Sequence, residues 1–260
     1  MDNTAFEKNR QCKAERMQTI EIAIISDIHA NIIALEEAFD DIRKKGITQV
    51  YCLGDLVDFA PWGNEVIARI RDRGIPCILG NHDERIAYDQ PIIPLAHHDS
   101  IETAHRELAI RFSKNTITDD NKKWLAELPF QLELTFKLGE QLKRILLVHA
   151  SPRSNDEYVF ESDPKEGLLD MLGGNKVDAI VMGHTHFSYV QHYAGVLFVN
   201  CGSVGRSKEK DRKAAYAMLT ISADGISAEI CKVDYPITEV ANAIYESNIP
   251  DFYGDFLLLK

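Results

Sequence analysis

The sequence predicts an α/β fold on the basis of three observations. Residues 22–25 form an unbroken apolar run, which is typical of a buried strand with both faces covered. Strand and helix patterns alternate from Ile20 to about Pro94, as expected for parallel strands joined by helices. Several of these strands end in Gly or Ser, followed by an acid, an amide or a histidine. In α/β proteins such side chains lie beyond the carboxyl ends of the strands, where ligands bind.

The first strand is followed by two polar side chains. The apolar run ends at Ser26, and Asp27 and His29 come directly after it. Asn31 is suited to cap the next helix, because apolar residues recur at helical spacing over 32–39. Asp27 and His29 are therefore expected at the edge of the sheet, beside the start of that helix.

Two further strands are expected at 49–53 and 75–79, with a helix over 65–73 between them. Each strand leads into a segment rich in potential ligands, namely Gly54-Asp55-Leu56-Val57-Asp58 and Gly80-Asn81-His82-Asp83. Glycine allows the chain to turn sharply, so the side chain that follows is expected to point away from the sheet edge.

The middle of the chain has a helical and more polar pattern. Residues 95–128 are expected to form a helical insertion that caps the site. His97 and His98 are expected on its surface, because adjacent residues point in different directions on a helix. Residues 1–18 are polar and are expected to form a flexible N-terminal extension, which leaves 19–260 as a single domain.

The second half of the chain is richer in strands. A hairpin is expected from 132–138 and 145–148, and it ends at His149. Later strands are expected at 179–182, 196–199, 214–221 and 226–233, with a helix over 237–244. The strand at 179–182 leads into Gly183-His184-Thr185-His186. The apolar tail at 251–259 is expected to dock onto the body of the protein or onto a partner subunit.

Composition and charge limit the class of function. The formal net charge of −11 disfavours binding to nucleic acid or to anionic membranes. The 5 cysteines are scattered and include no C-x-x-C pair, so neither a disulfide framework nor a zinc-thiolate site is expected. No apolar run approaches the ~20 residues of a membrane span, and the N-terminus shows no signal region. We therefore expect a cytoplasmic protein.

The strand ends together offer a set of metal ligands: Asp27, His29, Asp55, Asn81, His149, His184 and His186. Carboxylate, amide and imidazole groups without a thiolate suit Mn, Fe, Co, Ni or Zn. Seven protein ligands are too many for one such ion, so two ions that share a carboxylate fit better. Two ions about 3.5–4 Å apart bind two oxygens of a phosphoryl group and lower the pKa of a bridging water. The sequence therefore predicts two divalent transition-metal ions, with manganese favoured.

The ligand pattern resembles that of the calcineurin-like metallophosphoesterase superfamily, in which D-x-H, G-D-x-x-D, G-N-H-D/E, a lone H and G-H-x-H follow in this order. Here the five motifs are Asp27-Ile28-His29, Gly54 to Asp58, Gly80 to Asp83, His149 and Gly183 to His186. The turn at 200–205 followed by Arg206 resembles the small bacterial and archaeal phosphodiesterase branch. In that branch N-P-G-S is usual, and Cys201 replaces the proline here.

The resemblance implies a four-layer α/β/β/α sandwich with two mixed β-sheets and a two-metal site at the sheet edges. Carried over position by position, it assigns Asp27, His29 and His186 to the first ion, Asn81, His149 and His184 to the second, and Asp55 as the bridge. It assigns no metal to His82. That imidazole would protonate the leaving oxygen or stabilise the charge of the transition state, and Asp58 would orient it.

The favoured interpretation of function is two-metal-dependent hydrolysis of a small phosphate ester, such as a nucleotide, by a phosphodiesterase or phosphatase. A dinucleoside tetraphosphatase is one alternative. A serine/threonine-type protein phosphatase is another, but residues 59–62 lack the arginine with which those enzymes grip phosphoprotein. A third alternative is a binding scaffold, since a retromer subunit of this fold has a degraded metal site. No ligand position is degraded here, which favours catalysis over a scaffold. The sequence does not decide whether the protein forms a homo-oligomer.

Other side chains are candidates for contacts with substrate. Arg153, Arg206 and Lys208 are suited to phosphate, and Phe59, Trp62 and Tyr88 are suited to stack on a base. A nuclease is disfavoured by the net charge.

Overall fold

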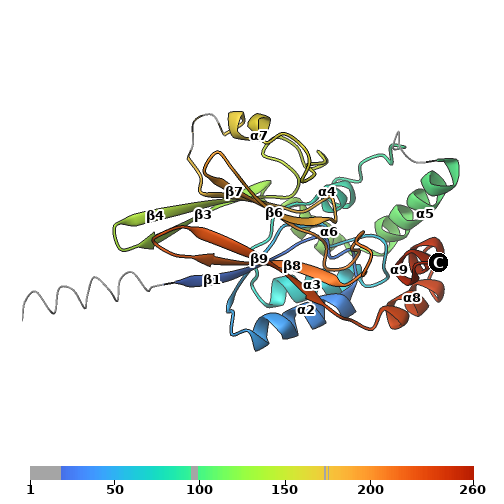
Figure 1. Cartoon of the computed structure of the whole chain (residues 1–260). Coiled ribbons are helices and arrows are strands. Elements are labelled where there is room, and N and C mark those ends of the chain that lie inside the picture. Colours follow the sequence, from blue (N-terminus) through green and yellow to red (C-terminus); the bar gives the residue numbers. More distant parts are fainter. Residues whose placement is uncertain (1–18, 95–98, 173, 175) are drawn as a thin grey trace, which may run out of the picture.

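The computed structural model describes residues 19–94, 99–172, 174 and 176–260, and it confirms the α/β fold with two mixed sheets (Figure 1). The first sheet has the strand order β2 (Gln49–Cys52), β1 (Ile20–Ile25), β8 (Ala214–Ile221) and β9 (Ile226–Val233). The second has the order β3 (Gln131–Leu138), β4 (Gln141–Val148), β5 (Ala179–Met182), β7 (Val196–Cys201) and β6 (Ser188–Tyr193). β1 pairs with β2 in parallel and with β8 antiparallel.

The alternation of side chains along β1 explains how the layers pack. Ile22 and Ile24 belong to a core cluster shared with residues of the second sheet. Ala23 and Ile25 belong to a different cluster, shared with the helices on the other face. Both faces of this strand are therefore buried, as its unbroken apolar run requires.

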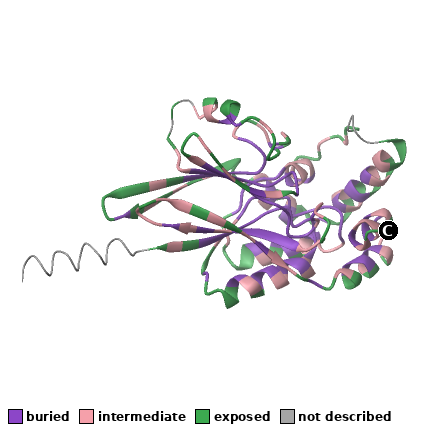
Figure 2. Ribbon diagram, viewed as in Figure 1, coloured by how far each residue is buried: buried purple, intermediate pink, exposed green. Residues whose placement is uncertain are grey.

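The helices cover the outer faces of the two sheets unequally (Figures 1 and 2). α2 (Ile32–Lys44) and α3 (Gly63–Asp72) pack against the first sheet. Over the second sheet lies one short helix, α7 (Glu166–Asp170), whose Leu168 packs on the core beneath it. The α/β/β/α order is confirmed, with a thin fourth layer.

Five helices gather at the end of the sheets where β1 ends (Figure 1). They are α4 (Asn81–Ala87), α5 (Ser100–Thr116), α6 (Asp119–Ala126), α8 (Ile237–Tyr245) and α9 (Phe252–Leu258). α9 is the apolar tail, and it docks onto the body, where the Tyr253 ring stacks on Phe59 with centroids 4.8 Å apart. α5 and α9 meet where His105 stacks on Phe252.

One expected strand is absent, and one strand was missed. Residues 75–79 do not form a strand and make only one bridge to β2, at Cys77. Pro76 lies in this segment and has no N–H to donate to a sheet ladder. β6 was not expected, because its half-polar sequence lacks a run of apolar residues.

The remaining expectations about the fold have different outcomes. His97 and His98 lie outside the described residues, as does the N-terminal extension at 1–18. Asn31 caps α2 as expected, since its side chain accepts a hydrogen bond from the Ala34 N–H. Cys201, which replaces the usual proline, is buried at the end of β7. Within the described residues, no helix is long and apolar enough to cross a membrane.

Candidate metal centre

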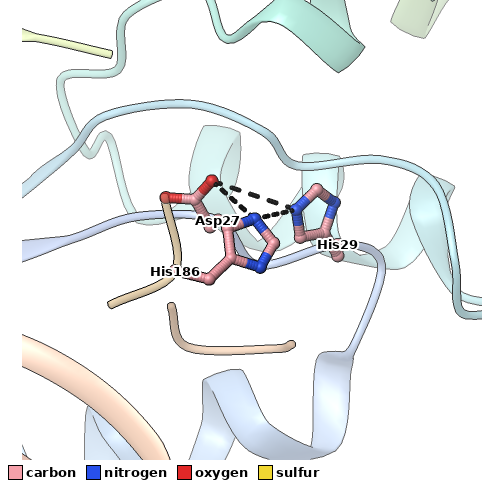
Figure 3. A group of neighbouring side chains, drawn as sticks. All are labelled: Asp27, His29 and His186. Carbon is pink, nitrogen blue, oxygen red and sulfur yellow. Dashed lines mark hydrogen bonds and ion pairs between the residues drawn. The ribbon is translucent and has the colours of Figure 1, made fainter. Parts of the chain in front are cut away.

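Six of the acids and histidines singled out in the sequence lie in two buried groups just beyond the ends of β1, β2, β4 and β5. The groups are Asp27, His29 and His186, and Asp55, His149 and His184. Within each group, the potential ligand atoms lie within 4.8 Å of one another. Figure 3 shows the first group, in which the three side chains point toward one another. The first group has the same residues that the resemblance assigned to the first ion, whereas the second group contains Asp55, which the resemblance assigned as the bridge.

The histidines of the first group turn lone pairs toward each other. His29 Nδ1 donates to the Val57 carbonyl at 3.0 Å, and His186 Nδ1 donates to the Arg206 carbonyl at 2.7 Å. A neutral imidazole that donates from Nδ1 has only a lone pair on Nε2. The two Nε2 atoms nevertheless lie 3.0 Å apart. Two lone pairs repel each other, so this geometry fits a site for a cation.

Asp27 adds an unsatisfied oxygen to the same group. Its Oδ2 accepts hydrogen bonds from Ser26 Oγ at 2.6 Å and from the His184 N–H at 2.9 Å. Its Oδ1 is buried without a hydrogen bond and lies 3.2 Å from His186 Nε2. A buried carboxylate oxygen without a donor is costly, and a metal ion would satisfy it.

The side chains of the second group also face one another. His149 Nδ1 donates to the Leu53 carbonyl at 2.8 Å, which turns its Nε2 toward the site. Burial would lower the pKa of His149, but the adjacent Asp55 raises it to about 10, so Nε2 carries a proton that a metal ion would displace. That Nε2 lies 3.1 Å from Asn81 Oδ1, and the same oxygen lies 3.2 Å from His184 Nδ1. His184 Nε2 is buried without a partner. The residues present therefore fit a metal ion here as well.

Asp55 lies between the two groups. Its Oδ2 is 3.7 Å from His29 Nε2 in the first group and 3.5 Å from His149 Nε2 in the second. Its Oδ1 accepts the backbone N–H of His82 at 2.8 Å, which fixes the orientation of the carboxylate. This is the position that a bridging ligand needs.

Burial and neighbouring charge set the protonation of these groups. Burial would raise the pKa of Asp27, but the nearby His186 and His149 outweigh it and hold that pKa well below its usual range. Burial lowers the pKa of His29 to about 3 and that of His184 to about 4, so both rings are neutral. Neutral imidazole is the form that binds metals.

The backbone at the centre is held in an unusual conformation. Five candidate ligands have positive φ: Asp27 (53°), His29 (49°), Asp55 (54°), His184 (65°) and His186 (62°). This region is unfavourable for residues other than glycine, and such strain gathers at functional sites. Hydrogen bonds between loops hold the backbone in this conformation. They include those from the His29 N–H to the Asp55 carbonyl and from Ser203 Oγ to the Asp27 carbonyl.

The glycines at the strand ends do not all serve the sharp turn expected from the sequence. Gly54 has a φ of 88°, as a turn requires, but Gly80 has an ordinary φ of −85°. A Cβ atom on Gly80 would collide with the backbone nitrogen and the carboxylate of Asp55. Gly80 is therefore needed for close packing of two loops.

Replacing Gly80 with Ala is expected to destabilise the fold by about 1–3 kcal/mol, because the backbone of Asp55 must move to admit the methyl group. Urea unfolding measures the change. Gly167→Ala is the matched control, since a Cβ there meets nothing within 4 Å and the residue lies in α7. Equal stability of the two variants would contradict the close-packing role.

His82, which is partly buried, and Asp58, which is fully buried, form a pair beside the two groups. His82 Nδ1 lies 2.5 Å from Asp58 Oδ2, and Arg85 Nη1 lies 3.2 Å from the same nitrogen. Burial raises the pKa of Asp58 to about 7. Burial and the nearby Arg85 lower the pKa of His82 well below its usual range. The contact between His82 Nδ1 and Asp58 Oδ2 therefore needs a proton on one of these two atoms.

A cavity of about 380 Å³ opens beside the candidate ligands. Of the side chains proposed for substrate contacts, Phe59, Arg206 and Lys208 line it. Arg153 instead forms an ion pair with Glu157 and lines a neighbouring cavity. Trp62 packs against the core, and Tyr88 is exposed, with its hydroxyl donating to the Ala126 carbonyl.

The cavity also contains residues that sequence reasoning missed. Arg85 lies one helical turn after His82 on α4, and this spacing was a usable signal. Arg106 lines the cavity from α5, and Tyr158 and Tyr253 line it from the loop before α7 and from α9. Nothing in their local sequence links these three residues to the motifs.

Comparisons with known proteins identify the family of this chain. Residues 20–224 match the model of the calcineurin-like phosphoesterase superfamily domain. An uncharacterized protein of Methanocaldococcus jannaschii is 30% identical over 255 residues, which cover 92% of this chain and 97% of the relative.

Two crystal structures share the fold. A metallophosphoesterase from Sphaerobacter thermophilus has a TM-score of 0.72 at 21% identity, covering 93% of this chain and 99% of its own. A hypothetical protein from Pyrococcus horikoshii has a TM-score of 0.75 at 19% identity, covering 92% of this chain and 97% of its own. Together with the match over residues 20–224, the sequence and fold show that this chain belongs to the calcineurin-like phosphoesterase superfamily of hydrolases.

Proposed function

We propose that the protein hydrolyses phosphate esters with two metal ions held by the two buried groups. The observation that carries this proposal is the convergence of lone pairs without donors, clearest in the 3.0 Å approach of His29 Nε2 to His186 Nε2. Asp27, His29 and His186 would hold one ion, and Asn81, His149 and His184 the other. Asp55 would bridge them, because its Oδ2 faces both groups.

The donor set decides which ions are suitable. Imidazole with carboxylate and amide oxygen, and no thiolate, suits Mn, Fe, Co, Ni or Zn, and we propose Mn as the working ion. When bound, such a pair of ions polarises the phosphoryl group and supplies a hydroxide nucleophile at neutral pH.

The residues of the chain then perform the remaining tasks. We propose that His82 stabilises charge on the leaving oxygen or gives it a proton, since the ring lines the cavity beside the candidate ligands. Asp58 orients the ring through the contact at Nδ1. Arg85, which also lies near Asp58 at 3.9 Å, adds positive charge on the same side.

The cavities favour a phosphodiester as substrate. A second cavity of about 400 Å³ shares Asn81, Arg85 and Asp156 with the first. Two cavities that meet at a candidate ligand offer space for the two substituents of a diester. The phenyl and phenol rings of Phe59 and Tyr253 in the first cavity suit an aromatic substituent, such as a nucleobase.

Metal removal tests the proposal directly. Metal-stripped protein is expected to lose more than about 99% of its activity toward bis-p-nitrophenyl phosphate, and added Mn²⁺ to restore it, because no side chain replaces the ions. The diester is expected to be cleaved faster than p-nitrophenyl phosphate. Two tightly bound ions without turnover of either ester would instead favour a binding scaffold.

A further inference from the structure

The loop that follows β7 places two cationic side chains beside the first metal group. The Arg206 carbonyl accepts the Nδ1–H of His186, and the Lys208 N–H donates to the His186 carbonyl at 3.3 Å. The loop therefore wraps around this candidate ligand. The side chains of Arg206 and Lys208 both line the 380 Å³ cavity.

Arg206 is held by aromatic rings and not by an acid. Its Cζ lies 4.5 Å from the ring centroids of Phe59 and Phe256 and 5.4 Å from that of Tyr253. Its Nε is buried without a hydrogen bond. Within the part of the chain that the structure describes, no carboxylate forms an ion pair with this guanidinium. The rings fix the position of the charge and leave it uncompensated.

Lys208 is also a cation beside an aromatic ring without an acidic partner among the described residues. Its Nζ lies over the Tyr158 ring at 5.6 Å. Burial and the nearby Arg206 together lower the pKa of its ammonium to about 8. Two partly buried cations side by side are unfavourable unless an anion joins them.

The other two cations of the cavity are already engaged. Arg85 faces Asp58 at 3.9 Å, and Arg106 donates to the Ile93 carbonyl at 3.0 Å. The chain as a whole carries 40 acidic and 29 basic residues, so acids are abundant as partners elsewhere. The lack of one at Arg206 and Lys208 marks this pair as a site for an anion from outside the chain.

We propose that Arg206 and Lys208 form a subsite for a second phosphate group of the substrate, next to the phosphate that reacts at the metal centre. This inference rests on the proposed function. The Phe59 ring lies between Arg206 and the first group. It contacts the guanidinium of Arg206, and its centroid lies 5.0 Å from that of the His29 ring. The substrate class is therefore an ester with adjacent phosphates, as in a nucleoside diphosphate or its derivatives. A guanidinium and an ammonium match the two negative charges of a terminal phosphate.

Inhibition by two nucleotides tests the subsite. AMP and ADP are compared as competitors of Mn-dependent hydrolysis of bis-p-nitrophenyl phosphate, with free Mn²⁺ held constant. ADP is expected to inhibit about 10-fold more strongly than AMP, or better, because only ADP reaches the cation pair with a second phosphate. In Arg206→Gln and in Lys208→Gln this advantage is expected to fall to about 3-fold or less.

Lys210→Gln is the matched control, since Lys210 is exposed in the same loop and does not line the cavity. It is expected to keep the wild-type ratio. Equal inhibition by AMP and ADP in the wild type would overturn the subsite, as would an advantage that survives in both variants. Failure of the wild type to cleave the diester would instead overturn the proposed function. The ADP-to-AMP ratio is then measured by calorimetry on Mn-loaded protein.

Discussion

Replacing Asp55 with Asn is expected to lower kcat/KM for bis-p-nitrophenyl phosphate by about 10³-fold or more. The reason is the position of Asp55 Oδ2, which faces both His29 and His149 and would join the two ions. A metal pair contributes several kcal/mol of charge stabilisation to the transition state, and each 1.36 kcal/mol corresponds to a factor of ten. Asn keeps the size of the side chain, so the loss reflects charge and ligation.

Metal content separates this explanation from misfolding. Asp55→Asn is expected to bind fewer than two Mn²⁺ ions per chain, as measured by elemental analysis after dialysis. Asp224→Asn removes the same charge from an exposed turn and is expected to retain wild-type activity and metal content. A variant with two bound ions and full activity would show that Asp55 is not the bridge.

Replacing His82 with Ala is expected to reduce kcat by about 10²- to 10⁴-fold while both ions stay bound. His82 is not among the candidate ligand groups, but its ring lines the cavity and its Nδ1 is held by Asp58. The variant removes the imidazole and leaves the candidate ligands in place.

The leaving group distinguishes the two roles of His82. If it protonates the leaving oxygen, the loss in kcat grows as the leaving alcohol becomes less acidic, from p-nitrophenol to phenol. If it stabilises charge on the phosphoryl group, the loss is nearly constant across the series. Asp58→Asn is expected to show a smaller loss with the same trend, because that residue acts only through the ring. Loss of bound metal in His82→Ala would place this residue among the ligands.

Most residues that cluster at the candidate centre could be identified from local sequence. Asp27 and His29 follow the end of β1, and His184 and His186 follow the end of β5, so each pair is tied to a buried apolar run. Such runs become strands wherever they can be covered on both faces, and residues just after them must lie at the sheet edge.

Predictions from local sequence failed in one case because a local signal was overlooked, and in the others because long-range packing sets the outcome. Pro76 prevents a regular strand in a segment whose apolar pattern predicted one. Gly80 matters because another loop approaches it, a contact that its own neighbours in sequence do not indicate. Arg106 enters the cavity from α5 for the same kind of reason.

The sequence by itself determined the fold class and the chemical nature of the centre, since both depend on which side chains end each apolar run. Tertiary structure alone decided the geometry. His29 and His186 are separated by 157 positions, and their 3.0 Å approach depends on how the two sheets pack together. The same packing places Asp55 between the groups and brings α9 against Arg206. These contacts arise between elements distant in the chain, where no periodicity or local motif specifies how side chains meet.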